Sequence, residues 1–124
     1  MAREIETKCI HLEEEENSIN HYGAISYPIY QSATYAHPGV GQSTGYDYSR
    51  LQNPTREHLE KTVASLENGI DALAFSSGMA AITLMMELFK PGDHLIVDAD
   101  LYGGSIRLFN HVSEKNGIDL SSVD

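Results

Sequence analysis

The pattern of apolar and polar positions predicts a strand–helix–strand unit in the second half of the chain. Residues 72–75 form a short apolar run typical of a buried strand, and residues 79–90 are rich in Ala, Leu and Met, which favour helix. After the turn dipeptide Pro91-Gly92, residues 94–97 form a second apolar run bounded by aspartates, as in a buried parallel strand. The pattern therefore predicts one βαβ unit, with residues 76–78 as the turn from strand into helix.

A second helix is predicted before this unit. Asn53 is a favoured N-cap and Pro54 suits the first helical position. Leu59, Val63 and Leu66 follow at helical spacing until Asn68-Gly69, a pair that ends helices.

A third helix is predicted after the unit, from about Ser105 to Asn116-Gly117, with Ile106, Phe109 and Val112 on one face. Residues 118–124 begin a further strand. An open parallel sheet is an unusual place for a chain to finish, because exposed strand edges invite pairing. We therefore expect the chain to be the N-terminal portion of a longer enzyme.

The first 50 residues show no sustained period of helix or strand. Gly and Pro are frequent, yet the segment also carries several large apolar and aromatic side chains: Ile25, Tyr27, Ile29, Tyr30 and Tyr35. Such a segment cannot build its own core and should pack on something else. The predicted organisation is an extended arm over residues 1–52 that packs on a neighbouring subunit of a homo-oligomer, followed by the start of an α/β domain over residues 53–124.

Composition narrows the function classes. The 124 residues are 41% apolar and carry a formal charge of −10, which argues against a nucleic-acid partner. Residues 13–16, all Glu, are expected to be a solvated arm. Cys9 is the single cysteine and is expected to be inert. The sequence shows no signal peptide and no apolar run long enough to span a membrane, so we expect a cytoplasmic protein without membrane contact. The histidines lack ligand-like pairing, so no metal site is predicted.

The Tyr48-Ser49-Arg50 stretch is a candidate phosphate site. Arg offers a planar fork of donors that matches a phosphate, and a Tyr two residues earlier in extended chain projects to the same side. Taken alone, the residues favour the alternative of a Tyr packed at an interface beside an Arg that pairs with one of the many acids.

The turn at Ser77-Gly78-Met79 is a second candidate. A helix N-terminus presents unpaired N–H groups and the positive end of the helix dipole, so an anion suits it; an ordinary capped helix fits as well. The turn lacks the glycine spacing of dinucleotide sites and the Lys of P-loops. Tyr102 follows the strand predicted to end near Asp98, which places it at the same sheet edge, where its ring could lie on a planar cofactor. A core or surface tyrosine is the alternative.

Taken together, these stretches resemble the trans-sulfuration family of pyridoxal-phosphate (PLP) enzymes, which includes cystathionine γ-synthase, cystathionine γ-lyase, methionine γ-lyase and O-acetylhomoserine sulfhydrylase. The resemblance covers nearly the whole chain and rests on several separated stretches, namely "PIYQSATYAH", "YDYSRLQNPTREHLEKTVASLE", "SSGMAAI", "KPGDHLIV" and "DLYGGS". It implies the N-terminal part of the large domain of a fold-type I (aspartate-aminotransferase-like) PLP enzyme, a mostly parallel sheet with flanking helices.

The resemblance also implies roles for individual residues. Tyr48 and Arg50 would reach the cofactor phosphate of the neighbouring subunit, Gly78 and Met79 would bind the same phosphate through backbone N–H groups with Ser77 beside them, and Tyr102 would stack on the pyridine ring and assist proton transfer. The expected cofactor is therefore pyridoxal 5′-phosphate, in a homodimer or homotetramer that acts on a small amino acid.

In that family the Schiff-base lysine lies later in the chain than residue 124, and no lysine here occupies its context. The resemblance implies an enzyme that catalyses γ-replacement or elimination on sulfur amino acids or O-acylhomoserine. The 124-residue piece alone is expected to be inactive. Gly103-Gly104 is the commoner form in synthases, cystathionine lyases and sulfhydrylases, whereas methionine γ-lyases typically have Gly-Cys. The rival class is a non-catalytic phosphate-binding or interaction module.

Overall fold

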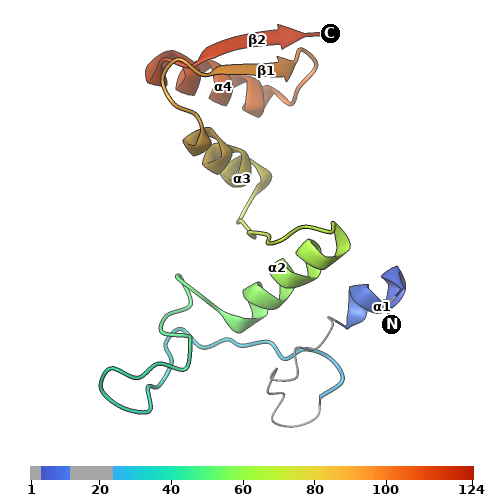
Figure 1. Cartoon of the computed structure of the whole chain (residues 1–124), viewed down its shortest axis with the longest axis vertical. Helices are drawn as coiled ribbons and strands as arrows, with labels where there is room; N and C mark the ends of the chain where they lie inside the picture. Colours follow the sequence, from blue (N-terminus) through green and yellow to red (C-terminus); the bar gives the residue numbers. More distant parts are fainter. Residues whose placement is uncertain (1–3, 12–23) are drawn as a thin grey trace. The chain divides into compact units, whose positions relative to one another are not determined.

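The structure of the chain is a computed structural model that describes residues 4–11 and 24–124. It divides into two compact units, Met1–Ala74 and Phe75–Asp124. The predicted acidic arm at residues 13–16 lies outside the described residues. Figure 1 labels the helices α1 (Ile5–Ile10), α2 (Pro54–Leu66), α3 (Gly78–Met85) and α4 (Gly103–Asn116) and the strands β1 (His94–Asp98) and β2 (Asp119–Val123). A 3-10 turn, η1 (Met86–Leu88), follows α3.

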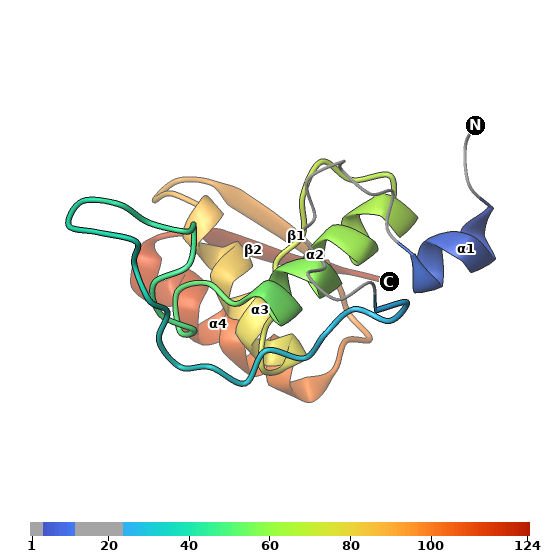
Figure 2. The same ribbon diagram turned by 90° about the horizontal axis from the view of Figure 1, so that it is seen from below.

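The second unit contains a parallel two-stranded sheet. Strands β1 and β2 pair from His94 opposite Asp119 to Asp98 opposite Val123, and α4 is the crossover that joins them. Figures 1 and 2 show α4 packed along this sheet. Met86, Phe109 and Ile118 form the buried core, around which partly buried apolar side chains of α3, β1, α4 and β2 pack. The predicted α/β class and the strand begun after residue 118 are confirmed.

The predicted strand at residues 72–75 is wrong. The structure has no strand there, so the observed βαβ unit is β1–α4–β2 rather than the one predicted around α3. A strand requires a partner for its backbone groups. The backbone N–H of Ala74 instead donates to Oε1 of Glu60 at 2.8 Å, within the first unit. The helical run after the turn is confirmed as α3, although it tightens into η1 before Phe89.

Two further expectations need correction in the second unit. Strand β1 is not buried: its residues alternate between exposed and half-buried. The face of α4 is also shifted, because Ser105, Phe109 and Ser113 are the buried residues and Ile106 is 37% exposed. Small Ser side chains allow α4 to approach its neighbours closely. Of the predicted face, Phe109 lies in the core and Val112 packs against it, partly buried. The helix ends at Gly117 as predicted, in the left-handed conformation with φ 67°.

In the first unit, α2 begins and ends as predicted. Oδ1 of Asn53 accepts the N–H of Thr55 at 2.9 Å, and Pro54 occupies the first helical position. Asn68, with φ 54°, ends the run in the left-handed region that Asn tolerates. On the surface of α2, Lys61 pairs with Glu57 at 2.7 Å and the Tyr46 hydroxyl donates to the same carboxylate. These two partners, Lys61 first, lower the pKa of Glu57, while burial is the main cause that raises the pKa of Tyr46.

The first unit buries little apolar surface. Among the described residues of this unit, only Pro54 and Ala64 are buried, whereas Ile25, Ile29 and Val40 are 77% exposed or more. The helix α1 was not predicted, and Cys9 within it is exposed. An arm over residues 1–52 that packs on a neighbouring subunit stays a prediction, as does the division of the chain at residue 52.

Every helix within residues 4–11 and 24–124 is too short or too polar to span a bilayer. Within the same residues, His, Cys, Asp and Glu side chains form no group of three that could hold a metal ion.

The stacked pair of Tyr27 and His58 gives a prediction about pH. Their ring centroids lie 3.8 Å apart with an interplanar angle of 9°, and burial, followed by the Lys61 charge, lowers the pKa of His58 below 6.5. We expect Tyr27→Ala to raise this pKa back toward 6.5, measured by NMR titration of the imidazole, because the substitution removes the ring that desolvates it.

Tyr27→Phe is the matched control, since it keeps the stacked ring and should leave the pKa of His58 lowered. The lowered pKa also makes the free energy of unfolding depend on pH. Because the pKa of His58 is lower in the folded state than in the unfolded state, its stabilising contribution is present above pH 6.5 and is lost as the pH falls through the folded-state pKa. An unchanged pKa of His58 in Tyr27→Ala would show that Tyr27 is not the cause of the shift.

Candidate functional site

The turn into α3 leaves two backbone donors available. Ser77 is extended, with φ −160° and ψ 159°, and caps the helix as predicted: its Oγ accepts the N–H of Ala80 at 3.1 Å and its carbonyl accepts that of Ala81 at 3.2 Å. The earlier N–H groups of the turn, those of Gly78 and Met79, have no intrahelical acceptor. Space beside Gly78 is open, because a Cβ built there would meet no atom within 4 Å.

The turn into α4 lies against the turn into α3. Oγ of Ser105 is 3.8 Å from Sδ of Met79, and a Cβ at Gly104 would lie 3.3 Å from the same sulfur. Tyr102 is the N-cap of α4, and its carbonyl accepts the N–H groups of Ser105 at 2.8 Å and Ile106 at 3.2 Å. The first turns of two helices therefore meet, and the positive ends of both helix dipoles gather at one place.

The Tyr102 ring folds back over the start of its own helix. A Cβ at Gly104 would lie 2.5 Å from Cε1 of this ring and 3.1 Å from Cδ1, so only glycine permits the observed position. Tyr102 is nevertheless 72% exposed. The ring thus has surface left for a planar ligand at the place where the Met79 side chain meets the first turn of α4. The structure brings Ser77, Gly78, Met79 and Tyr102 into one region, as the sequence predicted, although the strand used to argue this is absent.

Tyr48 and Arg50 lie together in the first unit, but in a turn rather than in extended chain. The N–H groups of Leu51 and Gln52 both donate to the Tyr48 carbonyl, at 2.9 and 3.0 Å, and Tyr48 also forms an isolated antiparallel bridge with Thr34. The Arg50 guanidinium carbon lies 5.2 Å from the centroid of the Tyr48 ring, a cation–π distance.

The alternative in which Arg50 pairs with an acid of the same chain is not what the structure shows. Within the described residues, the ion pairs are His37–Asp47, Arg56–Glu60 and Lys61–Glu57. Arg50 is thus held over an aromatic ring, and no carboxylate of residues 4–11 or 24–124 pairs with it, an arrangement that leaves its fork of donors for an anion.

Sequence reasoning missed two residues that hold this turn. Arg56 and the side-chain amide of Asn53 both bond to Ser49, between Tyr48 and Arg50. Asn53 was recognised only as a helix cap. A signal for Arg56 was its place on the first turn of α2, four residues before Glu60, a spacing that brings the two side chains together.

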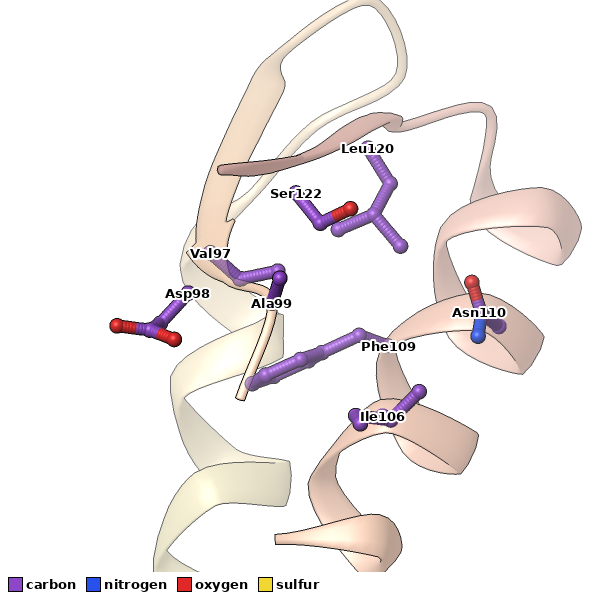
Figure 3. Close-up of a pocket in the computed structure, with 8 residues that line it drawn as sticks. All are labelled: Val97, Asp98, Ala99, Ile106, Phe109, Asn110, Leu120 and Ser122. Carbon is purple, nitrogen blue, oxygen red and sulfur yellow. The ribbon is translucent and has the colours of Figure 1, made fainter. Parts of the chain in front are cut away.

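A cavity of about 190 Å³ lies elsewhere in the second unit, between the sheet and α4. Figure 3 shows its lining, in which Val97, Phe109 and Leu120 face one another and the Asp98 carboxylate points away. None of the predicted site residues lines this cavity. It is an uncovered part of the apolar layer, without the converging charged groups that an anionic ligand requires.

Comparison with known proteins decides the family. Residues 6–124 match the model of the Cys/Met metabolism PLP-dependent enzymes. The chain belongs to this family. Among curated relatives, it is 50% identical over 118 residues to a cystathionine gamma-synthase/O-acetylhomoserine (thiol)-lyase of Bacillus subtilis, which covers 95% of this chain and 31% of the relative. It is 53% identical over 102 residues to a cystathionine gamma-lyase of the same species, covering 82% and 27%.

Solved structures agree. The cystathionine gamma synthase of Xanthomonas oryzae pv. oryzae, in complex with aminoacrylate and cysteine, superposes with a TM-score of 0.86 at 36% identity and covers 100% of this chain and 32% of its own. The cystathionine gamma-lyase of Lactobacillus plantarum, complexed with L-serine, gives 0.83 at 42% identity, covering 98% and 31%. The expected fold is thereby confirmed as the N-terminal part of a fold-type I PLP enzyme. The chain spans about a third of the length of the relatives it matches.

The residues of the α3 and α4 turns fit the cofactor of this PLP-dependent family. A phosphate dianion needs converging donors and room to approach the backbone closely. The N–H groups of Gly78 and Met79 are such donors, and the open space beside Gly78 gives the room. A flat pyridine ring needs an exposed aromatic face, which Tyr102 provides.

The two glycines after Tyr102 supply a matched pair of variants. Gly104→Ala should push the Tyr102 ring off the helix start, because the new methyl group would lie 2.5 Å from Cε1, while α4 remains formed. Gly103→Ala should leave the ring in place, since a Cβ there meets no atom within 4 Å. Crystal structures of both variants would check this, and an unmoved ring in Gly104→Ala would refute the packing described here.

Proposed function

We propose that this chain is part of a PLP-dependent enzyme that catalyses γ-replacement or elimination on sulfur amino acids or O-acylhomoserine. The observation that carries the proposal is the meeting of the Ser77-Gly78-Met79 turn with Tyr102 in a member of this family. The relatives support the reaction class, because they are named cystathionine gamma-synthase, gamma-lyase and beta-lyase.

Each residue of the meeting turns has a part in the proposal. The N–H groups of Gly78 and Met79 bind the phosphate of PLP. The Ser77 hydroxyl, whose oxygen accepts the N–H of Ala80, still has its own proton to donate to the same phosphate. The Tyr102 ring holds the pyridine plane, and its hydroxyl moves protons at the substrate carbons. Bound PLP supplies an electron sink for the carbanion that forms next to the amino group.

Tyr48 and Arg50 complete the phosphate site in this proposal, from a second copy of the chain. The guanidinium over the Tyr48 ring provides a planar fork for the phosphate oxygens. The arm of residues 1–52 then packs on a neighbouring subunit, which gives its exposed apolar side chains a partner and makes the enzyme a homodimer or homotetramer. A cytoplasmic location is part of the same proposal.

Two other reactions of this family remain as alternatives. O-acetylhomoserine sulfhydrylase is favoured by the name of the relative that is 50% identical. Methionine γ-lyase is disfavoured by Gly104, since that position is Cys in the form typical of those enzymes. A non-catalytic phosphate-binding module is the weakest alternative, because the family match extends over residues 6–124.

The test of the function uses the full-length protein that contains this chain. We expect it to bind PLP with a yellow absorbance band and to convert O-acylhomoserine with cysteine, or cystathionine alone. Tyr102→Phe should keep the stacking ring but lower kcat by roughly 10²- to 10⁴-fold, the typical worth of a proton-transfer group. Tyr30→Phe is the matched control and should retain kcat. No PLP band and no turnover of these substrates would refute the proposed function, and full kcat in Tyr102→Phe would refute the role of its hydroxyl.

The 124-residue chain by itself is expected to be inactive. In this proposal the lysine that binds PLP covalently belongs to a later part of the enzyme, so the chain has no positioned base for the substrate Cα. Turnover of cystathionine or an O-acylhomoserine by the purified 124-residue chain would contradict this. A mixture with catalytically competent full-length protein serves as the positive control for the assay.

A further inference from the structure

We propose that Arg56 is a positioning residue that fixes Tyr48 and Arg50 for phosphate binding. The inference rests on the proposed function, in which these two residues hold the phosphate of PLP. Arg56 lies in the first turn of α2, six residues after Arg50, and it would act on the ligand only through that turn.

The Arg56 guanidinium grips the backbone on both sides of Arg50. Nη1 donates to the carbonyl of Ser49 at 3.2 Å, and Nη2 donates to the carbonyl of Leu51 at 2.5 Å. Two carbonyls, one residue before and one residue after Arg50, are therefore fixed by a single rigid plane. The backbone of Arg50 cannot rotate without breaking one of these bonds, so the direction of its side chain is restricted.

A carboxylate holds the Arg56 plane in turn. Nε of Arg56 lies 3.7 Å from Oε1 of Glu60, whose side chain is only 16% exposed. The same Oε1 accepts the N–H of Ala74 at 2.8 Å. Arg56 and Glu60 thus join the turn that carries Arg50 to Ala74, which is three residues before Ser77 in the sequence.

Ser49 is held by several further bonds. Its N–H donates to the Ala33 carbonyl at 2.9 Å, and its hydroxyl bonds to the Ser32 carbonyl. Nδ2 of Asn53 also lies 2.9 Å from Ser49 Oγ, and it reaches the Tyr30 carbonyl at 3.1 Å. With its N–H, hydroxyl and carbonyl all engaged, Ser49 is a fixed point between Tyr48 and Arg50.

Arg56 is not itself placed to bind the phosphate. All three of its nitrogens already have partners, namely the two carbonyls and Glu60. Lysine could not replace it, because a single ammonium on a flexible stem lacks the fork that spans two carbonyls. Arg56→Lys therefore keeps the charge and removes only the positioning.

The test measures binding of PLP and of pyridoxal, which lacks the phosphate, to the full-length apoenzyme. Arg56→Lys should weaken PLP affinity about tenfold, in the range seen when a supporting residue behind a ligand is lost, and leave pyridoxal affinity unchanged. Glu60→Gln should shift PLP affinity in the same direction by a smaller factor. Arg107→Lys is the matched control, because Arg107 is an exposed arginine of α4 outside this network, and it should bind PLP as the parent does.

A double-mutant cycle separates this inference from the proposed function. Arg50→Met should weaken PLP binding, and adding Arg56→Lys to it should change the affinity no further, because Arg56 acts through the Arg50 turn. Undiminished PLP affinity in Arg50→Met would refute Arg50 as a phosphate ligand and, with it, the basis of the inference. If Arg50→Met weakens binding but Arg56→Lys has no effect, weakens pyridoxal equally, or adds fully to Arg50→Met, the positioning role alone is overturned.

Discussion

The close approach of the first turns of α3 and α4 is the constraint on which the candidate site depends. Two helix N-termini carry partial positive charge, and bringing them together is unfavourable unless something negative lies nearby. The contacts of the Met79 sulfur with Ser105 and of the Gly104 position with the Tyr102 ring bring no negative charge to the helix starts. In the proposed function, an external anion at this place would complement both the helix dipoles and the N–H groups of Gly78 and Met79.

Much of this arrangement could be predicted from local sequence. Caps act over three or four residues, so Asn53 and Ser77 could be recognised as helix starts, and Gly117 as a helix end, without knowledge of the fold. The predicted strand at residues 72–75 failed because a parallel strand depends on a distant partner that no local pattern specifies. In the described residues, those backbone groups lie free of any ladder, and one of them bonds to Glu60.

The candidate site shows the same division between local and distant information. Ser77, Gly78 and Met79 are adjacent in the sequence, and their chemistry follows from the helix that they begin. The bonds that fix the Arg50 turn are different, because they join residues far apart in the sequence. Arg56 donates to the backbone carbonyl of Ser49 and pairs with Glu60, whose carboxylate also accepts the N–H of Ala74. Sequence patterns describe side-chain types, and they do not specify which backbone carbonyl will accept a hydrogen bond from a given arginine.

The first unit therefore defines its geometry by hydrogen bonds rather than by a core. Few of its apolar side chains are buried, so packing cannot fix the turn at Tyr48 to Arg50. Arg56 and Asn53 instead bind main-chain carbonyls, which every residue type provides. The position of Arg50 is thus insensitive to the side chain at Leu51, whose carbonyl alone is used, but sensitive to the two polar residues of α2 that make the bonds. A turn held by such bonds keeps the Arg50 backbone in place without help from apolar packing, which is what the proposed binding of a phosphate by its guanidinium requires.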